Sequence, residues 1–225
     1  MHVVFFGDSL TWGGYGGDYV GEVRVRVGER HHIVNAGEGG NTVVNLNRRV
    51  MQDVLSHEPD AVFVMIGGND VVSYSQPDTR PYYRKAMQLP SGYVDPATFR
   101  SEYDALLTTL QTSYAQITVG LPPIEANETV VQTLRDYNGI AHELAAAHSI
   151  PVLDLFARYV PADIPARPPV TNKFIIEIGE RERTGWNDWY TAQAAGGYTY
   201  TFDGVHWTPR IAAAVAEQVI TAIGL

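Results

Sequence analysis

A serine, a histidine and an aspartate in this sequence together have the chemistry of a proton-transfer chain. Ser9 ends the run "VVFFGDS", and Asp203 and His206 stand close together in "DGVHW" near the other end of the chain. A serine hydroxyl is a weak nucleophile at neutral pH and needs a neighbouring base. An imidazole can be that base, and a carboxylate can fix its tautomer and stabilise its cation. Ser9, Asp203 and His206 are therefore candidates for acyl transfer, provided that the fold brings them together.

Acyl transfer also needs hydrogen-bond donors for the oxygen that becomes negative in the transition state. The backbone N–H of Ser9 is one candidate. The segment "NAGEGGNT" contributes a loop glycine such as Gly40, whose missing side chain would let a second backbone N–H approach a substrate. The segment "GGND" contributes the side-chain amide of Asn69. We expect these three groups to form an oxyanion hole.

An alternation of strands and helices must position these residues. Continuous apolar runs are typical of parallel strands that are covered on both faces. Helical spacing follows the capping residues Asp95, Asn127 and Thr208, and the first of these helices is expected to reach Tyr114. The segment "GEVRVRVGER" alternates like a strand, but parallel neighbours need a long crossover, so we expect a helix there. The predicted strands are residues 2–6, 33–35, 61–66, 117–121 and 151–155.

This alternation predicts an α/β fold, with a mostly five-stranded parallel sheet between two helical layers. In open sheets of this kind, ligands bind beyond the carboxyl ends of the strands. Ser9, "NAGEGGNT" and "GGND" follow the first three strands, and "DGVHW" precedes the last helix. Their convergence at one edge of the sheet is therefore expected.

Two connections are too long for ordinary loops. They cover about residues 71–96 and 157–200 and are rich in Tyr, Trp and Pro. We interpret them as insertions on a single domain of residues 1–225, because neither has an apolar pattern of core size. "ERERTGW" is interpreted as a solvated, mixed-charge stretch. Aromatic faces suit sugar rings, aryl groups and acyl groups, so the candidate substrate contacts are Trp12, Trp186, Trp189 and Tyr198.

The composition limits the partners. The formal net charge is −9 and no basic cluster occurs, which argues against nucleic acid as a ligand. No apolar stretch has the length of a membrane span, and no leader is visible, so a cytoplasmic location is expected unless a leader has been removed. The pair His31 and His32 lacks further ligands and is interpreted as a surface pair rather than a metal site.

The four segments together resemble the SGNH hydrolase family, which includes the GDSL-type esterases and lipases. "GDSLTWG" resembles its nucleophile block, "NAGEGGNT" its second block, "GGND" its third and "DGVH" its last, all in the family's order. The resemblance implies a flavodoxin-like α/β/α sandwich that hydrolyses esters or thioesters without a metal or organic cofactor. It also implies Gly40 and Asn69 as oxyanion donors beside Ser9, and Asp203 and His206 as partners of the nucleophile.

These inferences predict a serine esterase that forms an acyl-enzyme intermediate on a small-molecule ester. Short-chain or acetyl esters are favoured, with carbohydrate as one alcohol component. The alternatives are a thioesterase, a lysophospholipase-type lipase, or an inactive carbohydrate-binding protein on the same fold. A lipase is less favoured because no apolar lid helix is evident in the insertions. The oligomeric state, the acyl length and the alcohol are left open by the sequence.

Overall fold

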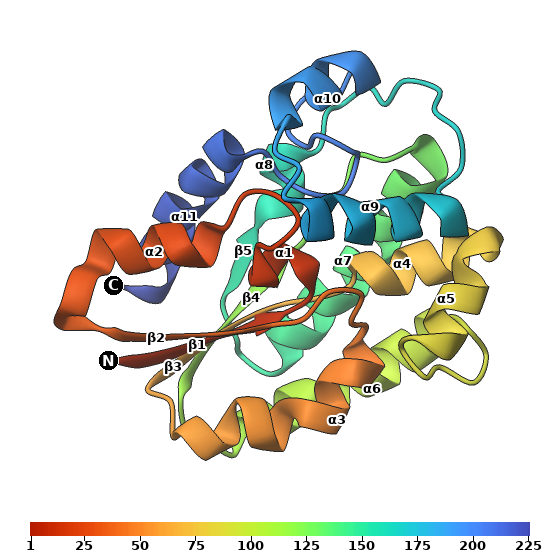
Figure 1. Cartoon of the computed structure of the whole chain (residues 1–225). Helices are drawn as coiled ribbons and strands as arrows, with labels where there is room; N and C mark the ends of the chain where they lie inside the picture. Colours follow the sequence, from red (N-terminus) through yellow and green to blue (C-terminus); the bar gives the residue numbers. More distant parts are fainter.

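The centre of the molecule is a five-stranded parallel sheet, seen in a computed structural model that describes residues 1–225 (Figure 1). The strand order is β2-β1-β3-β4-β5, and β1 pairs with β2 on one side and β3 on the other. The predicted α/β fold is confirmed, and all five strands lie within a residue or two of their predicted ends. The strands are β1 His2–Gly7, β2 His32–Gly37, β3 Ala61–Met65, β4 Gln116–Leu121 and β5 Val152–Asp154.

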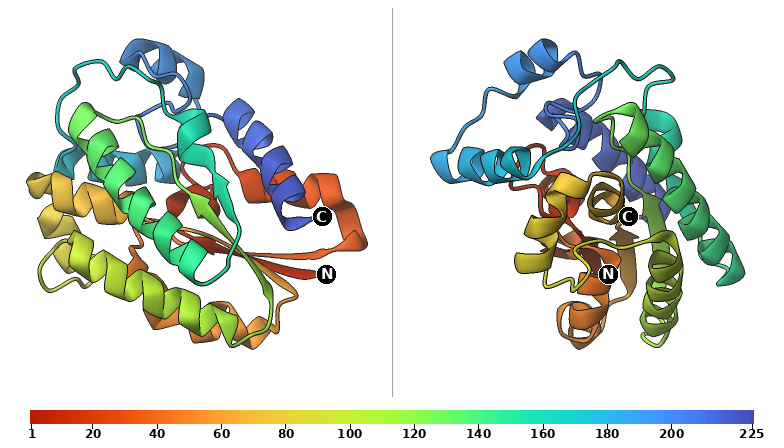
Figure 2. Two further views of the ribbon diagram at one scale, coloured as in Figure 1. Left: turned by 180° about the vertical axis from the view of Figure 1, so that it is seen from behind. Right: turned by 90° about the vertical axis from the view of Figure 1, so that its right-hand side faces the viewer.

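Helices cover both faces of this sheet, which gives three layers (Figure 2). Side chains alternate along β1, so that Val4 and Phe6 pack against one helical layer and Val3 and Phe5 against the other. The first layer consists of α3 Val43–Asp53, α6 Pro96–Gln111 and α7 Glu128–Ala147, and the second of α2 Tyr19–Val27 and α11 Pro209–Ile223.

The helix ends follow the predicted capping residues, with one exception. Asp95 accepts the backbone N–H of Thr98 at the start of α6, and Asn127 accepts that of Val130 at the start of α7. The helix predicted for "GEVRVRVGER" is confirmed as α2, followed by the 3₁₀ turn Gly28–Arg30. The extension of α6 to Tyr114 is wrong: the helix ends at Gln111, and Tyr114 is exposed with φ 58° in the turn that leads into β4.

The remaining helices lie near the carboxyl ends of the strands. Residues 157–200 form two full helices in the upper part of Figure 1. None of the helices in the molecule has the length and apolarity needed to cross a membrane. These remaining elements are α1 Ser9–Trp12, α4 Gly68–Ser75, α5 Arg80–Lys85, α8 Leu155–Tyr159, α9 Asn172–Thr184 and α10 Trp189–Gly196, with 3₁₀ turns at Leu55–His57 and Pro77–Thr79.

Candidate active site

Ser9 is held where β1 turns sharply into the short helix α1. The preceding residue, Asp8, caps this helix, and its Oδ1 accepts the backbone N–H of Leu10 at 3.0 Å. Gly13 ends the helix with φ 80°, a conformation that favours glycine. The Ser9 side chain is therefore fixed at the edge of the sheet, where residue 9 is 6% exposed.

Asp203 and His206 are brought together by a tight turn. Gly204 has φ 91°, and Asp203 Oδ1 accepts the backbone N–H groups of Val205 at 2.9 Å and His206 at 2.8 Å. Asp203 Oδ2 lies 3.0 Å from His206 Nδ1. Because a carboxylate only accepts, Nδ1 carries the proton and Nε2 is left as the acceptor.

His206 Nε2 lies 3.0 Å from Ser9 Oγ, which closes a chain from hydroxyl to imidazole to carboxylate across 197 residues of sequence. All three residues are buried. Burial alone would raise the pKa of Asp203, but the neighbouring His206 ring and the hydrogen bonds from residues 205 and 206 lower it below its ordinary value. The carboxylate is therefore ionised and able to stabilise an imidazolium.

A second buried carboxylate, Glu125, fixes the segment that leads to this turn. It follows β4 and is completely buried. Its Oε1 accepts the backbone N–H groups of Tyr200 and Thr201, both at 2.7 Å, and the Thr201 hydroxyl at 2.8 Å. The Thr201 hydroxyl oxygen also accepts the N–H of Gly204, and Glu125 N–H donates to the carbonyl of Gly204 at 2.9 Å. Glu125 thus anchors the turn that carries His206 through both the Thr201 side chain and the backbone.

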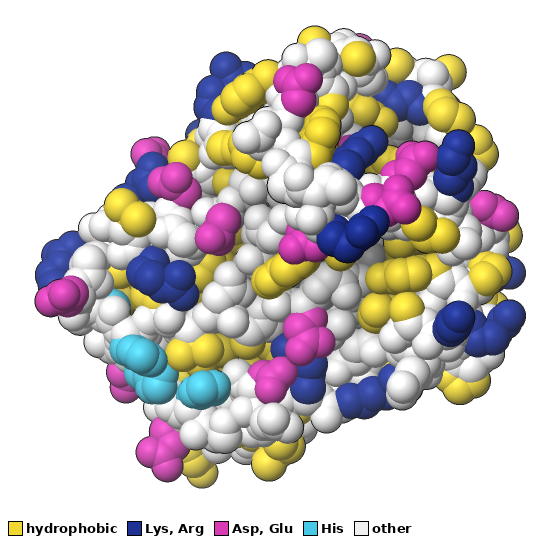
Figure 3. Space-filling model, viewed as in Figure 1, with side chains coloured by type: hydrophobic (Ala, Val, Ile, Leu, Met, Phe, Trp, Pro, Cys, Tyr) yellow, Lys and Arg dark blue, Asp and Glu magenta, His cyan; other side chains and the backbone are white.

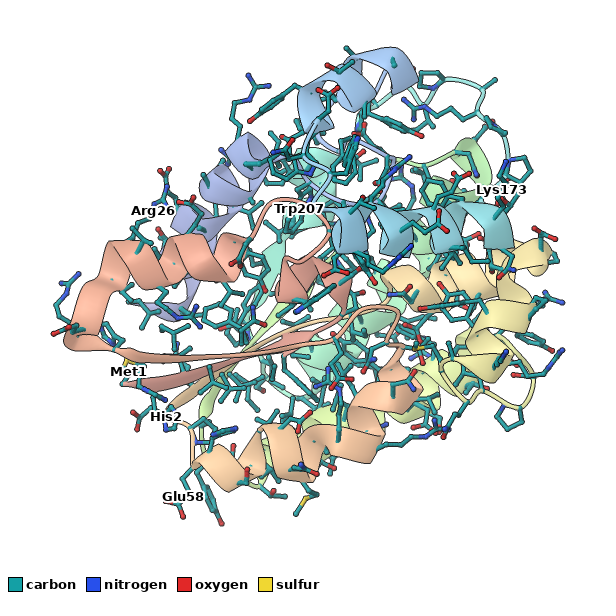
Figure 4. The ribbon with its side chains drawn as sticks, in the orientation of Figure 1. Met1, His2, Arg26, Glu58, Lys173 and Trp207 are labelled. Atoms are coloured by element: carbon teal, nitrogen blue, oxygen red, sulfur yellow. The ribbon has the colours of Figure 1, made fainter.

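Trp207 anchors the other side of the same turn. Its side chain is 1% exposed and packs edge-on against Tyr19 with ring centroids 5.8 Å apart. Figure 4 shows it in the interior, between α9 and α2. A large buried ring directly after His206 limits how far the imidazole can move.

The three residues predicted to form an oxyanion hole, Ser9, Gly40 and Asn69, all line one cavity. The backbone N–H groups of Ser9 and Gly40 donate to no acceptor in the protein. Gly40 has φ 80°, and a Cβ there would lie 2.4 Å from the Tyr82 hydroxyl, so only glycine fits. Asn69, near the start of α4, contributes its side-chain amide to the same cavity.

Two buried side chains orient the Asn69 amide. Asn69 Nδ2 donates to Asp8 Oδ2 at 3.3 Å, and Asn69 Oδ1 accepts the Tyr83 hydroxyl at 2.8 Å. The amide nitrogen has two hydrogens, so one is left for a ligand. Burial raises the pKa of Tyr83 well above its ordinary value, which keeps its hydroxyl protonated as the donor.

Two carboxyl groups beneath the site have raised pKa values. Burial raises the pKa of Asp8 to about 6, although hydrogen bonds from Leu10 and Asn69 and the neighbouring His206 oppose this rise. Burial also raises the pKa of Asp70 to about 8, and Asp8 adds to that effect. Asp70 accepts the backbone N–H of Val43 at 3.1 Å, which joins α4 to the start of α3. Both groups accept hydrogen bonds that brace the loops around Ser9.

Sequence and structure comparisons identify the family. A family model described as "GDSL-like Lipase/Acylhydrolase family" matches residues 5–214. The chain belongs to this family. It is therefore an enzyme that hydrolyses esters.

Individual relatives agree with this assignment. An acetylxylan esterase of Geobacillus stearothermophilus is 30% identical over 169 residues, which cover 64% of this chain and 70% of the relative. The fold is similar to that of the crystal structure of the acetyl xylan esterase AlAXEase, at a TM-score of 0.66, 22% identity, and coverage of 99% of this chain and 100% of the other. It is also similar to a lipase/acylhydrolase from Enterococcus faecalis, at a TM-score of 0.63, 19% identity, and coverage of 99% and 94%.

In this GDSL-like hydrolase, the Ser9 hydroxyl opens into a cavity of about 220 Å³. Apart from Asp8, Ser9, Asn69 and His206, the lining side chains are aliphatic or aromatic, with glycines between them. One wall is the helix α9, from within residues 157–200. This helix was not predicted: no apolar lid helix is evident in the sequence of the insertions, whereas α9 turns an apolar face towards the cavity. Of its residues, Phe174, Ile175, Ile176, Ile178 and Gly179 line the cavity.

The four aromatic residues predicted to contact substrate do not line this cavity. Trp12 and Trp186 lie one ring away from the imidazole of His206: Trp12 packs on Tyr15, and Trp186 packs on Phe202. Tyr198 packs beneath the guanidinium of Arg167, 4.1 Å from its ring centroid, and Trp189 lies in α10. The aromatic residues that do line the cavity are Tyr15, Tyr82, Tyr83 and Phe174.

Signals for α9 were present in the sequence. Thr171 caps its start by accepting the N–H of Phe174, and Gly185 ends it with φ 67°. Between them, Phe174, Ile175 and Ile178 have helical spacing. The charged run that follows belongs largely to the outward side of the same helix. Tyr83 and Glu125 had no comparable signal, because their roles depend on contacts between distant loops.

Proposed function

We propose that this protein is a serine esterase in which Ser9 is the nucleophile, His206 the general base and Asp203 the residue that orients it. The observation that carries the proposal is the closed hydrogen-bonded chain of these three side chains, with 3.0 Å at each link. It lies beside backbone donors at residues 9 and 40 that have no acceptor in the protein. This arrangement supports nucleophilic catalysis at an acyl carbon.

In the first half of the reaction, Ser9 Oγ attacks the acyl carbon of the ester while His206 Nε2 takes the hydroxyl proton. The carbonyl oxygen becomes negative and is stabilised by the N–H groups of Ser9 and Gly40 and by Asn69. The carbon–oxygen bond to the alcohol then breaks. The proton on His206 passes to the leaving alcohol, and an acyl-serine remains.

In the second half, a water molecule attacks the acyl-serine while His206 takes one of its protons. The same donors stabilise the second tetrahedral intermediate. The bond between the acyl carbon and Ser9 Oγ breaks, the proton returns to Oγ, and the carboxylic acid leaves. Asp203 stays ionised throughout, in keeping with its lowered pKa.

Two observations bear on the substrate. Relatives with similar sequence or fold are named as acetylxylan esterases, which favours acetyl esters on carbohydrate. The cavity beside Ser9 is apolar, which favours an ester that has a larger apolar group. Both are carboxylic esters and would react by the same steps.

Labelling of the serine tests the proposal directly. A fluorophosphonate loses fluoride when an activated serine attacks its phosphorus, so the purified protein should gain one adduct at Ser9 and lose esterase activity in parallel. Ser9→Ala should lose both labelling and activity towards p-nitrophenyl esters, whereas the control Ser101→Ala, at an exposed serine of α6, should keep both. Activity that survives in Ser9→Ala would overturn the assignment of the nucleophile.

A further inference from the structure

The face that α9 turns towards the site is built to receive an apolar group. Phe174, Ile175, Ile178 and Gly179 recur at the spacing of one helical face and all line the cavity. The outward side carries charged residues instead. Figure 3 shows charged side chains over α9 and hydrophobic side chains gathered below it, over α4 and α5. Helix α9 therefore forms an apolar roof over Ser9.

The opposite walls of the cavity are also apolar. Val72 of α4 and Ile124 of the loop after β4 are both buried and also line the cavity. No Lys, Arg, Glu, Gln or Thr side chain lines the cavity. Its carboxyl, amide and imidazole groups, from Asp8, Asn69 and His206, belong to the reaction centre or brace it. A sugar ring would find only tyrosine hydroxyl groups as partners beyond that centre.

Gly179 leaves room in the middle of the roof. A Cβ at this position would meet no atom within 4 Å, and its φ is not in the left-handed region. Glycine inside a helix is unfavourable relative to alanine because it loses more conformational freedom. Neither the backbone conformation nor close packing calls for glycine here. Its effect is to keep the cavity open.

The size of the cavity limits the group it can hold. An apolar protein cavity of about 150 Å³ holds a benzene molecule. At about 220 Å³, this cavity has space for a phenyl ring or an alkyl chain of medium length beside Ser9. An acetyl group would leave most of the space empty.

The position of His206 shows which half of the ester occupies this space. His206 gives its proton to the leaving alcohol, so the alcohol lies on the side of the imidazole and the acyl group points away from it. The N-terminal end of α9 lies on that other side: Asn172 N–H donates to Asp78 at 3.0 Å, Val170 N–H donates to Gln76 at 2.9 Å, and α9 contacts α5. Figure 4 marks this end by Lys173, and Figure 1 shows the other end over α1.

We propose that the space between α9 and α4 binds an apolar acyl group, so that the enzyme prefers esters of medium-chain aliphatic or aromatic acids to acetyl esters, with Gly179 as the residue that keeps this space open. The inference rests on the proposed function, because it takes Ser9 and His206 as the reacting groups.

The preference of the unmodified enzyme is the first test. Each methylene buried in an apolar pocket is worth roughly a factor of four in kcat/KM. The four additional methylenes of p-nitrophenyl hexanoate should therefore raise kcat/KM over that of the acetate by up to about 250-fold. Xylose tetraacetate should be a weaker substrate than phenyl hexanoate. An enzyme that prefers p-nitrophenyl acetate or the acetylated sugar would overturn the proposal.

The variant Gly179→Leu tests the residue. The side chain of a helical residue points towards the N-terminus of its helix, so leucine would extend towards Ile175 and fill the acyl space. We expect kcat/KM for the hexanoate to fall about tenfold or more and that for the acetate to change less than about twofold. Equal losses on both esters would overturn the role of Gly179.

The matched control is Gly139→Leu in the middle of α7. That glycine also has no atom within 4 Å of its Cβ position, but it is exposed and does not line the cavity. Its kinetics should match those of the unmodified enzyme on both esters. Should Gly179→Leu fail to fold, Gly179→Ala, which can only favour the helix, gives the same test with a smaller loss on the hexanoate.

The failure of this inference can be told from the failure of the proposed function. If Ser9→Ala removes all activity and the acetate is still preferred, the acyl preference is wrong and the serine mechanism stands. If Ser9→Ala retains hydrolysis of both esters, the mechanism itself is wrong, and the acyl preference falls with it.

Discussion

The hydroxyl of Tyr83 offers a sharp test of how Asn69 is positioned. It donates to Asn69 Oδ1 at 2.8 Å from the one buried residue of helix α5, while Asp8 accepts from the amide nitrogen on the other side. Tyr83→Phe removes this one donor and leaves the ring in place. The amide of Asn69 then keeps a single contact to fix its orientation.

The expected loss follows from the strength of such a bond. A neutral hydrogen bond contributes about 0.5–1.5 kcal/mol net, and an acceptor left without a partner costs about 1–3 kcal/mol. If the Asn69 amide is less well oriented towards the oxyanion of the transition state, kcat should fall about 3- to 30-fold. It should not fall further than in Asn69→Ala, where loss of a whole oxyanion donor costs on the order of 10²–10³. KM should change less than about twofold, because the contact that is weakened forms in the transition state.

The assay is steady-state hydrolysis of p-nitrophenyl esters by four proteins: the unmodified enzyme, Tyr83→Phe, Asn69→Ala and the double variant. Because Tyr83 acts through Asn69, its substitution should cost nothing further in kcat once Asn69 is alanine. Tyr103→Phe is the matched control, since that hydroxyl is buried in α6 without a partner. The reasoning is refuted if Tyr83→Phe lowers kcat equally with and without Asn69, or leaves it unchanged.

Three further substitutions have definite expected outcomes. Asn69→Ala should lower kcat on the order of 10²–10³ with little change in KM, as measured by steady-state kinetics; an unchanged kcat would remove Asn69 from the oxyanion hole. Glu125→Gln should lower the free energy of unfolding by about 2–4 kcal/mol in urea titrations, because an amide NH₂ in place of Oε2 would face the backbone N–H of Thr199 and the donors to Oε1 would lose a charged acceptor. Asp70→Asn should gain stability relative to the unmodified enzyme as the pH rises. The folded protein keeps a proton on Asp70 up to a pKa of about 8, whereas the unfolded chain loses it near the ordinary value of 3.8. Between these two pH values, the unmodified enzyme therefore loses stability as the pH rises, by at most about 1.4 kcal/mol per pH unit. Melting temperatures of both proteins that run parallel from pH 5 to pH 8 would contradict this.

The residues around Ser9 could be predicted because each follows an element with a strong pattern. Ser9 and Asn69 follow the buried strands β1 and β3 within four residues, and the fold places those strand ends side by side. His206 comes just before the capped helix α11. Parallel strands bring their carboxyl ends to one edge, so the spacing of these residues along the chain was enough to predict their proximity.

Helix α9, the apolar roof of the cavity, could not be predicted in the same way. A helix that packs on the core shows a broad apolar stripe, whereas α9 has only one residue that is as buried as a core residue, Ile178. Its other apolar side chains face a cavity, and they are followed in sequence by charges that lie in solvent. At Tyr114 the helix was instead predicted to be too long. The spacing of Tyr114 continues the apolar stripe of α6, but the chain has already turned towards β4, and the tyrosine ring is exposed.

The turn of His206 and the segment before α9 are anchored through separate side chains of the loop after β4. The loop after β4 holds the turn of His206 through Glu125. Asn127 of the same loop donates to Gln76, whose Oε1 also accepts the N–H of Val170 just before α9. The proton-transfer chain and the roof are thus tied to a common loop by separate side chains. Because no hydrogen bond joins α9 to Asp203 or His206, side chains on its inner face can change the acyl group that fits while the spacing of the reacting groups stays the same.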